Sequence, residues 1–331
     1  MLAHPTKPDT LFRSRVLGIC LLGLGLLVAS SCSRSTIPPI REPAPAYTIV
    51  VTIPPLAGLT RALMPETTIQ TLIKPGQSPH TFEISPHDRA LLTHADLVVA
   101  VGMGIEAGLP DSLLDAPNVL RMDQALAIAA KPDDPAHPHS HHNPHLWLDL
   151  QNVKTFIPML ANRIIKLPTH NTGLTIDPDQ LRANEQQLLD KLDRLDQQYA
   201  QQLAPYAGAA LIAHHNAWSP LLARYQLTVV GTIETAEDTE PSPAHIAHLL
   251  DSAREQHVRA IIIEPQLSGA IAQRLARQLD IPIITLDPLG HGDWLAMMHS
   301  NLDAMVTGLQ QSSAPDASTP DTSTPAQDQT P

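Results

Sequence analysis

Short apolar runs alternate with amphipathic segments in the first half of the chain. Runs that are β-branched or continuously apolar predict strands at 47–53, 68–74, 96–102 and 118–123. Segments with helical periodicity predict helices at 55–64, 85–95 and 151–167, the last with an internal proline. This alternation of strands and helices predicts a parallel sheet covered by helices.

The same pattern starts again after residue 208. Strands are predicted at 209–214, 227–233, 260–264 and 282–287, and helices at 218–225, 242–256, 268–280 and 293–310. Ser242 followed by Pro243 is a favourable helix start, with serine as N-cap and proline in the first turn. The predicted fold class is therefore α/β, with two lobes that each contain a mainly parallel sheet flanked by helices.

A long polar helix is predicted over 177–203, between the two repeats. Its apolar residues fall on one stripe: Leu181, Leu188, Leu192, Leu195, Tyr199 and Leu203. At 1.5 Å per residue it would be roughly 39 Å long. We expect it to connect an N-terminal lobe (47–176) to a C-terminal lobe (204–310), each with its own core.

The first 31 residues have the pattern of a secretion signal. A basic start precedes the apolar run Val16–Ala29, and small residues lead to Cys32. This pattern predicts a lipoprotein signal peptide (1–31) with Cys32 lipidated; an ordinary secretory signal with an incidental cysteine is the alternative. The protein is then expected outside the cytoplasm, as a periplasmic or cell-surface lipoprotein.

Two segments are too rich in proline and polar residues to bury a core. Residues 32–46 are interpreted as a tether between the lipid and the first lobe, and 311–331 as a disordered tail.

The composition of the chain excludes some classes of partner and of site. The 331 residues carry 21 Lys and Arg against 33 Asp and Glu, a net charge of −12 that disfavours nucleic acid as a partner. Two cysteines exclude a disulfide scaffold and a cysteine-rich zinc module. The 17 histidines stand out, because neutral histidine is the commonest metal ligand.

Histidines and carboxylates lie where predicted strands end. In open α/β sheets, ligands bind beyond the carboxyl ends of the strands. The candidates there are His80, His214, His215, Glu264 and Asp287, and His145 precedes the helix at 151. Three histidines and one carboxylate would suit the tetrahedral preference of Zn²⁺.

Each of these residues also has an ordinary explanation. A single loop histidine is more often solvated or hydrogen-bonded than a ligand, and Asp287 could cap a turn. His214 and His215 are adjacent, and His215 is the better candidate because it starts the loop after the strand. Glu264 could be a ligand, a partner of a histidine ring nitrogen, or a neighbour of a helix dipole.

A histidine tract lies at 137–142, with the sequence HPHSHH. Its members His137, His139, His141 and His142 could capture metal weakly without a folded site. A solvated loop that happens to be rich in histidine is the alternative.

Several motifs together resemble a known family. These are SPHTFEISPHDRALLTHADLVVAVGMGIE (78–106), NPHLWLD (143–149), AHHNAWSPLLARYQL (213–227), EPSPAHIAHLL (240–250) and TLDPLG (285–290), with the long helix between them. In this order they resemble the solute-binding lipoproteins of bacterial zinc and manganese ABC importers, especially the zinc-uptake branch.

The resemblance implies two lobes joined by one long helix, with a metal ion in the cleft between them. It maps the ligands onto His80, His145, His215 and Asp287. Histidine at the third position and a histidine-rich loop before the second both resemble the zinc branch. The expected ligand is Zn²⁺, with Mn²⁺ possible, and the expected partner is an importer permease; we expect a monomer.

Four functions remain open at this stage. The first is a Zn²⁺ receptor that is not an enzyme; without a Walker-type loop the chain is not expected to power transport itself. The second is a receptor for Mn²⁺ or Fe²⁺, the third a zinc hydrolase although HExxH is absent, and the fourth an adhesin with a structural metal.

Overall fold

The strands in the first half of the chain form a parallel sheet, as predicted. The computed structural model describes residues 47–128, 143–168, 176–234 and 240–312, all within one compact unit, Ala44–Pro331. The strands are β1 (Ile49–Val51), β2 (Ile69–Thr71), β3 (Leu97–Ala100) and β4 (Val119–Arg121), in the order β2-β1-β3-β4. The helices are α1 (Pro54–Leu63), α2 (Pro86–His94), α3 (Asp111–Leu114), α4 (Met122–Ala125) and α5 (Leu150–Ile165), preceded by the 3₁₀ turn η1 (Leu146–Leu148). The short turns α3, α4 and η1 were not predicted.

The second half repeats this topology. Its strands are β5 (Ala210–Ala213), β6 (Thr228–Thr232), β7 (Ala260–Ile263) and β8 (Ile283–Thr285), all parallel and in the order β6-β5-β7-β8. Its helices are α7 (Ser219–Arg224), α8 (Pro243–Glu255), α9 (Ala270–Leu279) and α10 (Trp294–Gln311). The fold class predicted from the sequence is confirmed: two parallel sheets flanked by helices.

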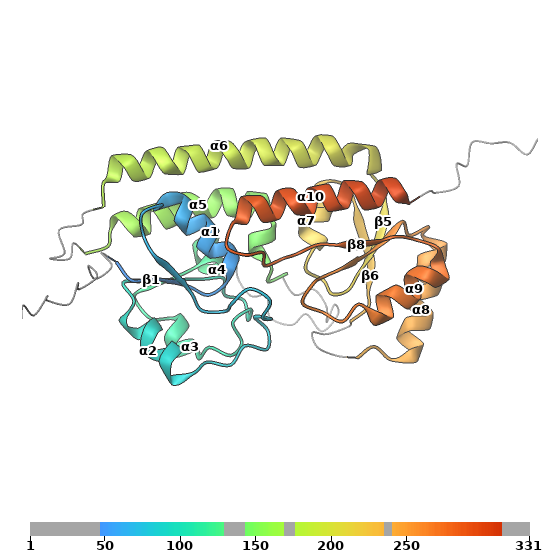
Figure 1. Ribbon diagram of the computed structural model, residues 1–331, viewed down its shortest axis with the longest axis horizontal. Helices are drawn as coiled ribbons and strands as arrows, with labels where there is room; N and C mark the ends of the chain where they lie inside the picture. The colour runs from blue at the N-terminus through green and yellow to red at the C-terminus, as the bar shows by residue number, and fades with distance from the viewer. Residues whose placement is uncertain (1–46, 129–142, 169–175, 235–239, 313–331) are drawn as a thin grey trace, which may run out of the picture. The chain divides into compact units, whose positions relative to one another are not determined.

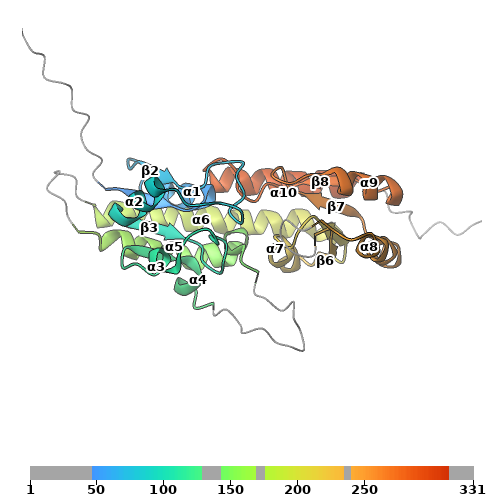
Figure 2. The same cartoon turned by 90° about the horizontal axis from the view of Figure 1, so that it is seen from below.

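A single long helix, α6 (Pro178–Leu203), lies between the two halves in sequence and is followed by the 3₁₀ turn η2 (Ala204–Tyr206). Asp177 caps it, because its carboxylate accepts hydrogen bonds from the backbone N–H groups of Asp179 and Gln180. Every residue of the predicted apolar stripe is buried. Figures 1 and 2 show α6 running past the elements of both lobes.

The strands divide their side chains between two faces with a period of two. In the first sheet, Val50 and Val98 face a small outer core that includes Leu92 of α2, whereas Val51 and Val99 face the main core. The second sheet follows the same rule: its outer face, with Ile212 and Ile261, packs on α8 and α9, and alternate residues of the same strands join the main core.

The inner faces of both sheets belong to one continuous hydrophobic cluster. This cluster contains residues of β1 and β3, of β5 and β7, and of the helices α1, α5, α6 and α10. The expectation that each lobe has its own core is therefore wrong for the inner faces. The reason is that α6 carries a buried stripe along its whole length, so it covers apolar surface in both lobes.

The last helix also contacts both lobes. α10 packs against α1 and α6 as well as against β8. At its start it approaches α1 so closely that a Cβ atom on Gly58 would lie 2.5 Å from the backbone nitrogen of Trp294. Arg61 of α1 donates a hydrogen bond to the carbonyl oxygen of Gly292 over 2.8 Å. The two lobes are therefore held together by contacts of α10 as well as by contacts of α6.

Several sequence predictions lie outside the described residues: the signal peptide with Cys32, the tether, the histidine tract at 137–142, and the tail beyond Ser312. The described helix α10 extends to Gln311. Among the helices of the described ranges, none combines the length and the apolar character needed to cross a bilayer.

The close approach of α1 and α10 predicts the effect of a single methyl group. We expect Gly58→Ala to lower the free energy of unfolding by about 1–3 kcal/mol, because the atom it meets is backbone and cannot rotate away. Gly269→Ala is the matched control, since its Cβ would meet neighbours only at 3.5 and 3.6 Å. Urea unfolding of both variants measures the difference, and equal stabilities would contradict the proposed packing.

Candidate metal centre

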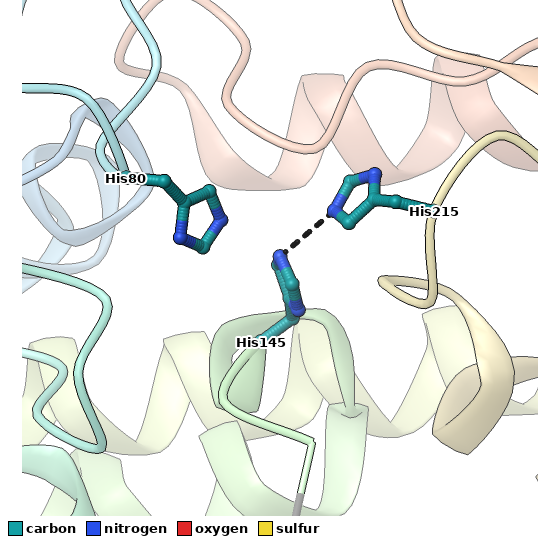
Figure 3. A group of neighbouring side chains, drawn as sticks. All are labelled: His80, His145 and His215. Atoms are coloured by element: carbon teal, nitrogen blue, oxygen red, sulfur yellow. Dashed lines mark hydrogen bonds between the residues drawn. The ribbon is translucent and has the colours of Figure 1, made fainter. Parts of the chain in front are cut away.

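Three of the predicted histidines come together between the two sheets. His80 lies in the loop between β2 and α2, His145 directly precedes η1, and His215 lies in the loop after β5. Figure 3 shows the three imidazoles pointing toward one another from these separate segments. The first two histidines belong to the N-terminal half and the third to the C-terminal half, so the group exists only where the halves meet.

The three rings are close enough to share one ion. One ligand nitrogen from each lies within 4.8 Å of the others. The ring centroids of His145 and His215 are 4.9 Å apart, and that of His80 lies 5.5 Å from His145 and 6.2 Å from His215. The Nε2 atoms of His145 and His215 are 3.1 Å apart. Two nitrogen ligands at about 2.0–2.1 Å from a tetrahedral Zn²⁺ would lie about 3.3–3.4 Å apart, close to this distance.

A short hydrogen-bonded turn orients His145. Its Nδ1–H donates to Oδ1 of Asn143 over 2.9 Å, and its backbone N–H donates to the same oxygen over 2.9 Å. Asn143 also donates from Nδ2 to the carbonyl oxygen of Asn216, which adjoins His215. Asn143 therefore aims Nε2 of His145 at the group and links the segments that carry two of its members.

Glu264 orients His215. Its Oε1 lies 2.9 Å from Nδ1 of His215 and accepts a hydrogen bond of 3.2 Å from the indole N–H of Trp218. Because a carboxylate oxygen can only accept, this contact favours a proton on Nδ1 and leaves a lone pair on Nε2. Among the three roles left open for Glu264, its position is that of a partner to a histidine ring nitrogen.

The two facing Nε2 atoms would repel each other if both carry lone pairs. When both imidazoles are neutral and protonated on Nδ1, each Nε2 carries a lone pair, and neither atom has a proton to offer the other. A 3.1 Å approach of two such lone pairs is favourable only with a positive charge between them or beside them. The donor set therefore suits a cation.

The position of His215 follows from the topology of the second sheet. The strand order reverses between β5 and β7, and the crevice beyond such a reversal is the usual ligand site of an open α/β sheet. His215 follows β5 and Glu264 follows β7, so the pair lies at this point. The adjacent His214 instead directs Nε2 to Oε1 of Glu234, at 3.0 Å, and is outside the group of three.

The loop that carries His80 depends on a glycine in a neighbouring segment. A Cβ atom on Gly108 would lie 1.7 Å from the carbonyl oxygen of Phe82, two residues after His80. Gly108 follows the buried Glu106, which accepts hydrogen bonds from Thr52 and from the backbone N–H groups of Val101 and Gly102. The backbone around Gly108 is thereby held against the His80 loop.

Asp287 does not join the described group of close ligand atoms. Its Oδ1 accepts hydrogen bonds from the Leu289 N–H over 3.0 Å and from Nε2 of Gln266 over 2.8 Å. Its backbone is fixed by Asn301 of α10, whose amide accepts from its N–H and donates to its carbonyl oxygen. The next two residues, Pro288 and Leu289, line the same cavity as the histidines.

This cavity has a volume of about 30 Å³. Besides the three histidines, its polar lining includes Ser78, Glu234, Glu264 and Gln266. The sequence analysis named neither Glu234 nor Gln266, and it gave Asn143 no orienting role. The rule that found Glu264 could have found the first two, since Glu234 and Gln266 also follow the carboxyl ends of strands.

Burial depresses the basicity of the central histidine. The pKa of His145 lies well below its ordinary value of 6.5, first because the ring is desolvated and then because His215 and His80 repel a positive charge on it. His145 is therefore neutral at neutral pH and offers Nε2 as a donor without first losing a proton.

Comparison with known proteins agrees with this architecture. Residues 49–308 match the sequence model of the family described as zinc-uptake complex component A, periplasmic (ZnuA). The crystal structure of a ZnuA superposes with a TM-score of 0.67 at 26% identity, covering 80% of this chain and 99% of that one.

The names of two relatives include a metal. The zinc-binding lipoprotein AdcA of Streptococcus pneumoniae is 27% identical over 284 residues, which are 78% of this chain and 54% of AdcA. This chain therefore spans about half the length of that relative. The manganese-binding lipoprotein MntA of Halalkalibacterium halodurans is 23% identical over 86% of this chain and 95% of its own length.

The depressed pKa of His145 predicts its titration in the metal-free protein. The folded state keeps His145 neutral below pH 6.5, whereas the unfolded chain takes up the proton, so this residue should lower the free energy of unfolding as pH falls below that value. NMR of the ring nitrogens should place the midpoint of His145 well below 6.5, and His215→Ala should raise it. A midpoint at or above 6.5 would contradict the buried position of the ring.

Proposed function

The chain belongs to the family of the periplasmic component A of zinc-uptake complexes, and from that membership we propose that it is a receptor that binds Zn²⁺ and delivers it to an importer permease. The observation that carries the proposal is the pair of Nε2 atoms 3.1 Å apart, with His80 beside them. His145 faces Asn143 through Nδ1, and Nδ1 of His215 lies 2.9 Å from Glu264, an arrangement that favours lone pairs on the two facing Nε2 atoms.

We assign the ligands as His80, His145, His215 and Asp287. The three imidazoles are neutral donors, and a fourth ligand with negative charge would reduce the net charge of a bound Zn²⁺ site to +1, which a buried site tolerates better than +2. Asp287 is supported as this ligand by its place after β8, next to cavity-lining Pro288. The tract at 137–142 is proposed to capture metal weakly before it reaches this site.

The proposed ligand set favours binding over catalysis. With Asp287 beside the three histidines, all four tetrahedral positions of Zn²⁺ are filled and none is left for a reactive water. A hydrolase would also need room for its substrate next to a metal-bound water. We therefore infer that the metal is the cargo of the protein and that the protein is not an enzyme.

Manganese is the second candidate, and the similarity to a manganese-binding lipoprotein favours it. Mn²⁺ prefers oxygen ligands, however, whereas imidazole suits Zn²⁺. Three of the four proposed ligands are imidazoles, so the donor set favours zinc.

The cellular setting proposed for the protein follows its family and its N-terminal sequence. We infer an extracytoplasmic protein that is anchored by lipid on Cys32 and acts as a monomer with the permease of an ABC importer. The C-terminal lobe is taken as 204–310 and the N-terminal lobe as 47–176, with α6 as the connector.

The ligand assignment predicts a specific loss of affinity. His80→Ala, His145→Ala and His215→Ala should each weaken Zn²⁺ binding at least about tenfold, because each removes one donor from a four-ligand site. The parent should bind one Zn²⁺ tightly and Mn²⁺ more weakly in titrations against a competing chelator, with the ions counted by elemental analysis. His248→Ala is the control, since His248 is exposed on α8.

Two results would contradict this assignment. A histidine variant with unchanged Zn²⁺ affinity would remove that residue from the ligand set. Tight Mn²⁺ with weaker Zn²⁺ in the parent would replace zinc by manganese as the cargo.

The continuous core predicts that the fold does not depend on the metal. Removal of Zn²⁺ by a chelator should leave the far-UV circular dichroism spectrum unchanged and should lower the unfolding temperature without abolishing the transition, because the apolar cluster involves residues far from the histidines. Loss of the spectrum on chelation would instead support a structural metal, as in the adhesin hypothesis.

A further inference from the structure

We propose that Gln266 is a positioning residue that holds the carboxylate of Asp287, so that the segment Glu264–Gln266 orients two of the four proposed ligands. This inference rests on the proposed function, because it concerns the geometry of the same metal centre. It assigns a role to a partly buried glutamine whose side chain donates to a carboxylate.

The topology of the second sheet places this segment between the two ligands. In the order β6-β5-β7-β8, the strand β7 lies between β5 and β8. The loop after β5 carries His215, the loop after β8 carries Asp287, and the segment after β7 begins with Glu264. Because all four strands are parallel, the three loops emerge at the same edge, with the segment after β7 in the middle.

The segment contacts one ligand on each side. Oε1 of Glu264 lies 2.9 Å from Nδ1 of His215, toward β5. Nε2 of Gln266 donates a hydrogen bond of 2.8 Å to Oδ1 of Asp287, toward β8. The carboxylate of Glu264 therefore faces a nitrogen of His215 that can donate a hydrogen bond. The amide of Gln266 donates a hydrogen bond to the carboxylate of Asp287.

The contact with Gln266 selects one oxygen of Asp287. Oδ1 already accepts the N–H of Leu289 over 3.0 Å, so with Gln266 it receives two donors. The backbone of Asp287 is held on both sides by Asn301. With Oδ1 engaged and the backbone fixed, Oδ2 is the oxygen that remains for the cation.

The side-chain amide of Gln266 is held with Nε2 toward Asp287. Its Oε1 is buried and has no hydrogen-bond partner within the described ranges, a placement that costs free energy. Turning the amide over would set Oε1 against the carboxylate of Asp287, which would be less favourable still. Gln266 also lines the cavity with the three histidines, so it lies between this cavity and Asp287.

The test measures whether Gln266 acts through Asp287. Zn²⁺ is titrated against a competing chelator into the purified parent, Gln266→Leu, Asp287→Ala and the double variant. Gln266→Leu removes the donor at similar size and should weaken Zn²⁺ binding about 10–100-fold. In the Asp287→Ala background the same change should have no further effect, because the carboxylate it positions is gone.

A spectroscopic measurement separates positioning from a general structural effect. With Co²⁺ as the probe, the visible absorption bands of Gln266→Leu should shift from those of the parent, because a displaced Asp287 changes the ligand field. Gln278→Leu is the matched control, since Gln278 is exposed on α9, and its Zn²⁺ affinity and Co²⁺ spectrum should equal those of the parent. If Gln266→Leu does not fold, Gln266→Glu replaces it, since it also removes the N–H donor.

The possible outcomes are distinct. Parental Zn²⁺ affinity in a folded Gln266 variant would overturn the inference, as would an equal loss with and without Asp287. Either result would leave the proposed function intact if His215→Ala still weakened Zn²⁺ binding at least about tenfold. Absence of a tight Zn²⁺ site in the parent would overturn the proposed function itself.

Discussion

The 3.1 Å separation between the Nε2 atoms of His145 and His215 depends on how the two lobes are held together. A shift of one lobe relative to the other would change this distance directly, because each lobe contributes one of the two rings. The contacts near the site oppose such a shift. Trp147 donates a 2.6 Å hydrogen bond to the carbonyl oxygen of Pro288, and Trp294 donates one of 2.9 Å to the carbonyl oxygen of Trp147. Together with the shared core, these bonds make the candidate metal centre part of the packing between the lobes.

The two sheets have the same topology, but different residues lie where their strand order reverses. In the second sheet, the reversal of strand order between β5 and β7 holds the pair of His215 and Glu264. In the first sheet, the corresponding place between β1 and β3 holds Thr52 and Glu106, 2.7 Å apart. Glu106 is 1% exposed, and burial raises its pKa. In the first sheet this position is therefore filled by two protein side chains. The histidine that this half contributes from a strand end to the candidate metal centre, His80, comes from the loop after the edge strand β2.

Local sequence patterns were enough for the parallel strands, for α6 with its buried stripe, and for the histidines at the strand ends. Each of these features depends on residues within a few positions of one another. The shared core and the contact of α10 with α1 were not predicted, because they join residues such as Gly58 and Trp294 that are far apart in sequence. The contact of Glu264 with His215 and that of Gln266 with Asp287 also join residues far apart in sequence. Asn143 lies only two positions from His145, but an isolated asparagine or glutamine gives no periodic signal. The assignment of Asp287 as a ligand still rests on the family pattern.

The contact of α10 with α1 has a consequence for the order in which the chain can fold. α10 is the last helix, yet it covers apolar surface of α1 in the N-terminal lobe. The hydrogen bond between Trp294 and Trp147 joins residues 147 positions apart. During synthesis, the first sheet and its helices emerge long before the helix that completes their packing. Part of the apolar surface of the N-terminal lobe therefore stays uncovered until nearly the whole chain is available. Contacts of such high sequence separation also slow folding.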